Sequence, residues 1–371
     1  MTAATRVGVI ESVDCEVYEI PTDRPEADGT LAWSATTMVL VALRAGGCEG
    51  IGWTYAGAGC RAVVEHQLTG VLRGGDPMDI PRLSQGMIRA CRNLGRPGLV
   101  SCAISAVDIA LWDLKARLLG VALSTLVGRF HDSVAVYGSG GFTTYDAATT
   151  RAQLGHWVHE LGVRRVKIKI AESWGTEEPR DLARVALARE AVGPDVEVYV
   201  DANGGYTRKQ AVRIGRALTQ AGVTWFEEPV SSDDLAGLRE VRDQVQADVA
   251  AGEYGYDLSY FARMVAAQAV DCLQVDVTRC GGITEFLRVA AVAAAHNLQV
   301  SAHCAPNLHA SVAVGVPNLR HLEYFHDHAR IEDMLFDGAL SPQAGRLCPD
   351  PDRPGLGLSL KTVDAEKFRV A

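Results

Sequence analysis

After about residue 130 the chain alternates short apolar runs with amphipathic helical segments, and this alternation occurs eight times. The intervening segments, such as residues 207–222 and 282–297, carry apolar residues at intervals of three and four, as helices with one buried face do. Eight strand–helix units predict a (β/α)-barrel. The eight runs are VAVYGS, VKIKI, VEVYVDA, TWFEEP, DVAAGE, CLQVDV, LQVSAH and HLEYF.

The first third of the chain has a different pattern. Residues 5–55 predict a three-stranded antiparallel meander, and residues 61–120 have a helical period, with Ser101 as an N-cap and Gly120 as a stop. The chain of 371 residues exceeds the roughly 250 of a typical barrel. We therefore predict an N-terminal α+β domain at 1–130, a barrel domain at 131–330 and a C-terminal segment at 331–371 that packs back on the first domain.

Composition excludes several classes of function. A net charge of -9 gives no basic field for nucleic acid. No run approaches the roughly 18 to 20 apolar residues of a membrane span, and we see no signal peptide. The nine cysteines are scattered without a CxxC pair, which predicts free thiols in the cytoplasm rather than a disulfide framework or a zinc site.

Three of the strand-like runs end in a carboxylate at equal spacing: Asp201, Glu227 and Glu253, with 227 − 201 = 253 − 227 = 26. In a barrel these three strand ends are adjacent, and three clustered acids repel one another unless a cation neutralises them. Mg²⁺ suits such oxygen ligands and leaves positions for substrate. The alternative is that each acid caps the following helix.

Candidate acid–base groups lie at other strand ends. Lys167 and Lys169 alternate with apolar residues and so share one face, where each is expected to lower the pKa of the other. Asp276 and His303 end two neighbouring runs, so the carboxylate can orient the imidazole. Glu323 in the last run, if protonated, would donate a hydrogen bond to a developing oxyanion.

A metal flanked by two bases suits removal of the proton α to a carboxylate, through an enediolate intermediate. The fate of that intermediate decides the reaction. Reprotonation on the other face gives racemisation or epimerisation, whereas departure of a β-hydroxyl gives dehydration.

The residues that carry this chemistry lie in motifs that resemble those of the mandelate racemase subgroup of the enolase superfamily, over nearly the whole chain. The motifs are GLVSCAISAVDIALWDLKARLLG, KIK, DANGGY, FEEP, GE, DVTRCGGIT, SAHCAP and LEYF. The resemblance implies a modified TIM barrel of the β7α type with an N-terminal capping domain. It also implies homo-oligomers, from dimer to octamer.

The resemblance assigns roles to these residues by position. Asp201, Glu227 and Glu253 would bind one Mg²⁺, with Glu227 preferred to Glu228 because the first acid of the motif is the usual ligand. Three further roles follow. Lys169 is implied as one base, tuned by Lys167, which also touches the substrate carboxylate; His303 with Asp276 is implied as the opposite base or acid; and Glu323 is implied as a hydrogen-bond donor.

The N-terminal domain of this family sends a mobile loop over the pocket, and residues 21–34 would supply it here. That segment carries Asp23, Arg24, Glu26 and Asp28, which suits a polar substrate rather than a phenyl-bearing one. The residues expected to contact substrate are Arg24, Trp33, Ser139 and Asn203, and Cys304 is expected to be a small wall residue.

The leading hypothesis is a Mg²⁺-dependent dehydratase that converts an acid sugar to a 2-keto-3-deoxy acid. The alternative is a racemase or epimerase of a 2-hydroxy or amino acid that uses the same residues. A remote alternative is a non-catalytic barrel protein. The sequence does not name the substrate, because specificity lies in loop geometry.

Overall fold

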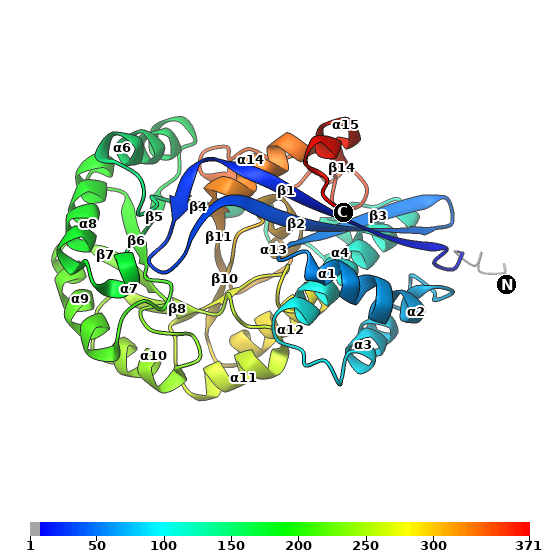
Figure 1. Cartoon of the computed structure of the whole chain (residues 1–371), viewed down its shortest axis with the longest axis horizontal. Helices are drawn as coiled ribbons and strands as arrows, with labels where there is room; N and C mark the ends of the chain where they lie inside the picture. Colours follow the sequence, from blue (N-terminus) through cyan, green and yellow to red (C-terminus); the bar gives the residue numbers. More distant parts are fainter. Residues whose placement is uncertain (1–7) are drawn as a thin grey trace.

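The computed structural model describes residues 8–371, and its centre is a closed barrel of eight parallel strands (Figure 1). Each strand pairs with the next, and β11 pairs back with β4 to close the ring. The predicted barrel is confirmed. Its strands are β4 (Val134–Gly140), β5 (Arg165–Lys169), β6 (Glu197–Asp201), β7 (Val223–Glu227), β8 (Asp248–Ala251), β9 (Cys272–Val275), β10 (Gln299–Ala302) and β11 (Leu319–Phe325).

Seven helical crossovers connect these strands, as in a modified TIM barrel of the β7α type. Local capping fixes several helix starts: a capping box of Thr207 and Gln210 begins α9, and the Asp257 side chain accepts from Tyr260 N at the start of α11. The connecting helices are α6 (Ala147–Gly155), α7 (Glu172–Gly175), α8 (Glu178–Val192), α9 (Arg208–Gln220), α10 (Leu235–Arg242), α11 (Leu258–Ala266), α12 (Gly282–Ala295) and α13 (Pro306–Ala313). Helix α14 (His326–Leu335) follows the last strand.

The N-terminal unit is the predicted antiparallel meander followed by helices. Its strands β1 (Ser12–Ala27), β2 (Ala32–Ala45) and β3 (Cys48–Tyr55) pair in chain order. A π-helical turn at Val64–Leu68 joins the first two short helices. The helices are α1 (Gly59–Val63), α2 (Thr69–Leu72), α3 (Ile80–Ala90), α4 (Leu99–Leu118) and the short α5 (Leu123–Val127).

Helix α4 lies between this sheet and the barrel and is buried along most of its length. Strand β3 approaches it so closely that a Cβ on Gly52 would lie 2.3 Å from Ala106 O, which explains the glycine. The Ser101 N-cap is a wrong prediction, because α4 begins at Leu99 and the Ser101 hydroxyl donates to Tyr256 O instead. The stop at Gly120 is confirmed by its positive φ of 67° just after the helix.

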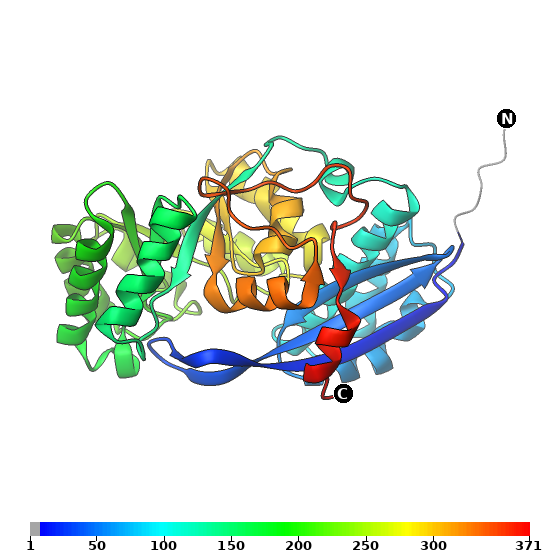
Figure 2. The same cartoon turned by 90° about the horizontal axis from the view of Figure 1, so that it is seen from above.

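Residues 21–34 form a strand hairpin rather than the predicted loop. Strands β1 and β2 continue past the sheet, with an irregularity between Pro21 and Glu26, and pair again at Ala27 and Ala32. The blue hairpin in Figures 1 and 2 extends from the sheet across the barrel. Its tip is held there by backbone hydrogen bonds, including Trp174 N to Gly29 O at 2.9 Å.

The C-terminal segment contacts both units. Strand β13 (Arg346–Leu347) pairs antiparallel with β4, and Ala371 O accepts a hydrogen bond from Val17 N in β1. The boundaries at 130 and 330 remain predictions. Its other elements are β12 (Phe336–Asp337), β14 (Ser359–Leu360), α15 (Thr362–Ala365) and a 3₁₀ turn at Glu366–Phe368.

Within residues 8–371, no helix has both the length and the apolar character needed to cross a membrane.

Candidate active site

Three buried carboxylates meet at the carboxyl ends of β6, β7 and β8. Asp201 and Glu227 are the last residues of their strands and stand opposite each other in register, and Glu253 lies two residues beyond β8. One side-chain oxygen from each residue lies within 4.8 Å of the others. The predicted acids are therefore brought together, and the cluster contains Glu227, not its neighbour Glu228.

This cluster fits a hard divalent cation. Its donors are all carboxylate oxygens, which Mg²⁺ prefers. Burial and the charge of Asp201 raise the pKa of Glu227 to about 8, so the three charges are unfavourable together without a cation. Two further buried oxygens beside them, Asn203 Oδ1 and Glu228 Oε1, have no hydrogen-bond partner among residues 8–371.

Both predicted lysines reach the carboxylates from β5. Lys169 Nζ lies 2.5 Å from Asp201 Oδ2, while Lys167 Nζ lies 2.5 Å from Glu227 and 2.7 Å from Glu323. Burial favours the neutral amines, but the surrounding carboxylates outweigh it and hold the pKa of both lysines above the usual value. Lys167 does lower the pKa of Lys169, as expected, but this repulsion is weaker than the attraction of the carboxylates, so the net shift is upward.

His303 follows β10 and is held by two carboxylates. Its Nδ1 lies 2.8 Å from Asp276 Oδ2, and its Nε2 lies 3.2 Å from Glu253. Burial opposes protonation of the imidazole, but the Cys304 sulfur and the neighbouring carboxylates together outweigh burial, so the pKa of His303 lies well above the usual value. The predicted Asp276–His303 pair is present, and its position favours a protonated His303 that can act as an acid.

Glu323 on β11 is an acceptor in this structure. Cys304 N donates to it at 3.2 Å, in addition to the contact with Lys167. Although burial opposes ionisation, Lys167 and His303 lower the pKa of Glu323 below its usual range. This arrangement favours the ionised form, because two cations face the carboxylate, and the role of Glu323 as a donor to substrate stays a prediction.

A cavity of about 340 Å³ opens beside these groups, between the strand ends and the hairpin. The predicted residues that line it are Lys169, Asn203, Glu253, His303, Glu323 and Trp33. Cys304 also lines it as expected, with burial raising the pKa of its thiol to about 12. Lys167, which was expected to touch the substrate carboxylate, is fully buried and is not part of the lining.

Two residues predicted to contact substrate do not face this cavity. Arg24 points to the outside, where its Nη1 donates to Thr149 Oγ1 at 3.1 Å. Ser139 is fully buried on β4 and is absent from the lining. The hairpin presents Asp28, Leu31 and Trp33 instead, so Asp28 is the one charged side chain of residues 21–34 that lines the cavity.

The sequence prediction missed two residues of the site. Arg279 lies between Glu253, at 3.2 Å, and Asp276, at 3.5 Å, and so connects the metal-ligand cluster to the Asp276–His303 pair. Its position three residues after Asp276, in DVTRCGG, could have indicated this role. His328 lines the cavity stacked on Tyr55, with ring centroids 3.5 Å apart. Burial lowers the pKa of His328 to about 3, so it is neutral. Nothing in the local sequence distinguished it from the other histidines nearby.

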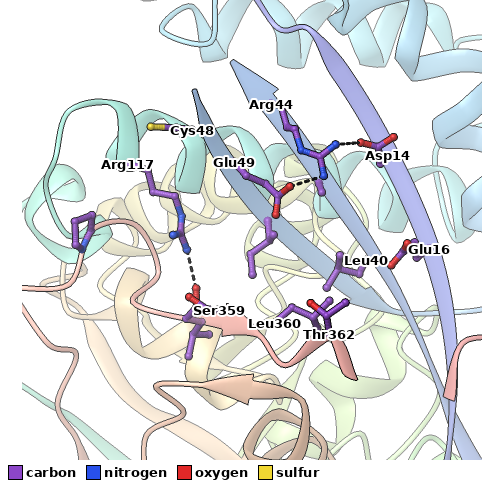
Figure 3. Close-up of a pocket in the computed structure, with 14 residues that line it drawn as sticks. Asp14, Glu16, Leu40, Arg44, Cys48, Glu49, Arg117, Ser359, Leu360 and Thr362 are labelled. Atoms are coloured by element: carbon purple, nitrogen blue, oxygen red, sulfur yellow. Dashed lines mark hydrogen bonds and ion pairs between the residues drawn. The ribbon is translucent and has the colours of Figure 1, made fainter. Parts of the chain in front are cut away.

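A larger hollow, of about 680 Å³, lies elsewhere, between the outer face of the β1–β3 sheet and the C-terminal segment (Figure 3). Three of its charged side chains are paired with each other, because Arg44 contacts both Asp14 and Glu49. None of the strand-end carboxylates or lysines reaches it. Size alone therefore does not locate the chemistry.

Comparison with known protein families shows which family the chain belongs to. Residues 15–128 match the mandelate racemase/muconate lactonizing enzyme N-terminal domain, and residues 149–365 match the enolase C-terminal domain-like family. The chain belongs to the mandelate racemase subgroup of the enolase superfamily. It is therefore an enzyme of that superfamily, and the non-catalytic alternative is set aside.

Individual members of the superfamily resemble the chain over nearly its full length. L-talarate/galactarate dehydratase of Salmonella typhimurium is 31% identical, over 97% of this chain and 91% of that protein. A mandelate racemase/muconate lactonizing enzyme-like protein of Rubrobacter xylanophilus is 50% identical, with a TM-score of 0.94 over 98% of this chain and 100% of that one. A racemase of Streptomyces coelicolor with bound magnesium is 31% identical, with a TM-score of 0.91 over 98% and 100% of the two chains.

Proposed function

We propose that this enolase-superfamily enzyme dehydrates an acid sugar to a 2-keto-3-deoxy acid, with one Mg²⁺ per subunit held by Asp201, Glu227 and Glu253. One observation carries the proposal. Lys169 on β5 and His303 after β10 line the same cavity, and in the barrel order the three carboxylate strands stand between them. A substrate carboxylate bound at Asp201, Glu227 and Glu253 would thus have the Lys169 amine on one side and the His303 imidazole on the other.

The chain's own residues perform the proton transfers. Mg²⁺ at the trio would polarise the substrate carboxylate and take up the negative charge that holds both lysines protonated. The C–H bond α to the carboxylate breaks and its proton goes to Lys169 Nζ. The C–O bond at the β carbon then breaks, and the oxygen leaves as water with the proton of His303. The resulting enol ketonises to the 2-keto-3-deoxy acid.

The supporting residues set the protonation states. Asp276 and Glu253 hold His303 in its charged form, which suits the acid rather than the base. Lys167 contacts Glu227 and Glu323 and is best placed to position them. Lys169 is assigned as the base because its ammonium contacts Asp201, and a metal that shares the charge of Asp201 would let Lys169 lose its proton and become a neutral amine.

The cavity lining favours a substrate with a single carboxylate. Two other basic side chains line the cavity besides Lys169 and His303, and neither offers a free positive charge. Arg279 is paired with Glu253, and burial lowers the pKa of His328 to about 3, so that His328 is neutral. Within the described residues, no unpaired cation lines the hairpin side for a second carboxylate. We therefore propose a polyhydroxy monoacid rather than a diacid.

The second candidate is racemisation or epimerisation of a 2-hydroxy or amino acid. The same placement of Lys169 and His303 favours it, since proton removal by one and return by the other inverts the α carbon. The Streptomyces coelicolor structure described as a racemase gives it further support.

Incubation of the purified chain with Mg²⁺ and matched panels of sugar monoacids and diacids tests these proposals. Formation of a 2-keto acid supports dehydration, and a preference for monoacids supports the charge argument. Exchange of the α-proton in D₂O with inversion and no 2-keto product would overturn dehydration in favour of racemisation. A Lys169→Met variant purified in the same way controls for contaminating enzymes.

We further propose that the enzyme works in the cytoplasm as a homo-oligomer. All nine cysteines are unpaired, which suits a reducing compartment. Light scattering coupled to size-exclusion chromatography would measure the oligomer size.

A further inference from the structure

A group of potential metal ligands outside the catalytic cavity joins the hairpin to the barrel. Asp23 and Glu26 lie on the part of β1 that extends past the sheet, and His326 is the first residue of α14. One ligand atom from each of the three lies within 4.8 Å of the others. None of these residues belongs to the catalytic carboxylate cluster.

Glu26 is a buried carboxylate with one oxygen that accepts no hydrogen bond among residues 8–371. Its side chain is fully buried, and its Oε2 accepts a hydrogen bond from Trp33 Nε1 at 2.9 Å. Its Oε1 has no hydrogen-bond partner among residues 8–371. An unfilled acceptor on a buried carboxylate is costly, so this oxygen is expected to meet a proton or a cation.

The charges around Glu26 favour a cation. Three carboxylates gather here, on Asp23, Glu26 and Asp327, and the permanent cation beside them is Arg330, which pairs with Asp327 at 2.6 Å. His326 Nε2 lies 3.2 Å from both oxygens of Asp23. Even with His326 protonated, negative charge exceeds positive charge in this group.

The other polar contacts of the group are already made. Thr36 donates its hydroxyl to Asp327, and Arg330 also donates to Pro21 O at 2.7 Å. These contacts leave Asp23 and His326 on the solvent side, with side chains 40% and 24% exposed. A small ion can therefore enter from solvent between two exposed ligands and the buried one.

We propose that Asp23, Glu26 and His326 form a second divalent-cation site that fastens the hairpin to the barrel. One imidazole nitrogen with two carboxylate oxygens suits Zn²⁺ better than Mg²⁺, which favours oxygen donors and retained water. The site bridges β1 and α14, so an ion bound there links the hairpin to the strand-end side of the barrel.

The site also connects to the catalytic cavity through Trp33. Glu26 holds the Trp33 indole, which lines the cavity and meets Phe142 edge-on with ring centroids 5.5 Å apart. An ion on Glu26 therefore fixes the carboxylate that positions this wall. Occupancy is expected to order the hairpin over the cavity.

Zn²⁺ alone, titrated into the full chain after chelator treatment, tests the site. The Asp201→Asn variant is used as the parent, because the loss of this carboxylate weakens metal binding at the catalytic cluster. We expect one equivalent of Zn²⁺ by calorimetry and by metal analysis after dialysis. Adding His326→Gln should weaken binding at least about 10-fold, because Gln supplies no imidazole nitrogen.

A second readout is independent of activity. Zn²⁺ should slow hydrogen exchange of the amides in residues 21–34 in the parent and not in the His326→Gln variant. His296→Gln, at an exposed position on the end of α12, is the matched control and should behave as the parent. Zn²⁺ binding unchanged by His326→Gln, or no equivalent bound at all, would overturn the proposal. Glu26→Gln, which replaces the buried ligand, should also weaken Zn²⁺ binding. If this variant fails to fold, Asp23→Asn replaces an exposed ligand instead and should weaken Zn²⁺ binding as well.

Discussion

The two walls of the catalytic cavity use their charged residues in opposite ways. At the strand ends, Lys169 and His303 line the cavity, and Lys169 contacts the buried Asp201. On the hairpin, Asp23 and Arg24 point outward, to His326 and Thr149. The strand ends thus supply the reactive groups, and the hairpin supplies a largely uncharged cover.

The difference arises from how each wall is built. A closed barrel brings all strand ends to one rim, so a residue's position along its strand determines where its side chain points. The hairpin has an irregularity between Pro21 and Glu26, which breaks the alternation of its side chains. The residue types at the strand ends therefore indicate which groups face the cavity, whereas the residue types in the hairpin do not.

Asp201→Asn, on the barrel wall, should have the largest effect on activity of the substitutions considered. It removes one carboxylate of the cluster and the partner of Lys169, so we expect activity to fall by at least about 10⁴-fold with loss of Mg²⁺ binding. Calorimetric titration with Mg²⁺ and steady-state kinetics measure the two effects. Asp195→Asn, at an exposed position, is the control. Mg²⁺ binding as tight as in the parent would show that the cluster is not the metal site.

Lys169→Met tests the barrel wall without removing a carboxylate. The loss of a general base should lower kcat by about 10² to 10⁴-fold while Mg²⁺ binding persists. Substrate incubated in D₂O reports on the α-proton directly, by NMR. Parental rates of deuterium exchange in this variant would assign proton removal to His303 instead.

Much of the site on the barrel wall could be predicted from the sequence, because a closed barrel leaves few alternative positions for side chains at the strand ends. The equal spacing of Asp201, Glu227 and Glu253 predicts one cluster, and the structure places their oxygens within 4.8 Å. The protonation states were not predictable in the same way. The pKa values of Lys169 and Glu323 depend on how many opposite charges face each group, and that number follows from packing across several strands.

The hairpin wall was less predictable, since its side-chain directions depend on contacts distant in sequence. Arg24 meets Thr149, a partner 125 residues away, and His328 reaches the cavity from α14. A polar segment with scattered charges predicts a loop, whereas pairing between Ala27 and Ala32 extends the strands. No local pattern specifies such pairings.

Asp276→Asn tests the orientation of His303. The imidazole loses the carboxylate at 2.8 Å, so we expect kcat to fall by about 10- to 100-fold. Since Asp276 raises the pKa of His303, a neutral Asn lowers it. An acid is lost as pH rises through its pKa, so the basic limb of the kcat profile should move to lower pH. A basic limb that stays in place would exclude His303 as that acid.

His328→Asn tests the cover side through stability. Burial lowers the pKa of His328 to about 3, so below the unfolded value of about 6.5 only the unfolded chain binds this proton, and stability falls as pH falls. By about pH 5 the loss amounts to roughly 2 kcal/mol. Asn keeps an acceptor for Ala305 N and does not titrate. Its Tm should change less between about pH 7.5 and pH 5 than that of the parent, and an equal change would contradict a buried neutral His328.

Arg24→Ala should have the smallest effect. Since Arg24 donates to Thr149 outside the cavity, we expect kcat and KM to stay within about twofold of the parent, as for a surface substitution. Trp33→Ala on the same hairpin removes a cavity wall and should raise KM several-fold. A larger effect from Arg24 than from Trp33 would mean that the hairpin turns its charged face to the substrate when substrate binds. The hairpin would then be a second source of charge in the cavity, and the argument for a monoacid would fail with it.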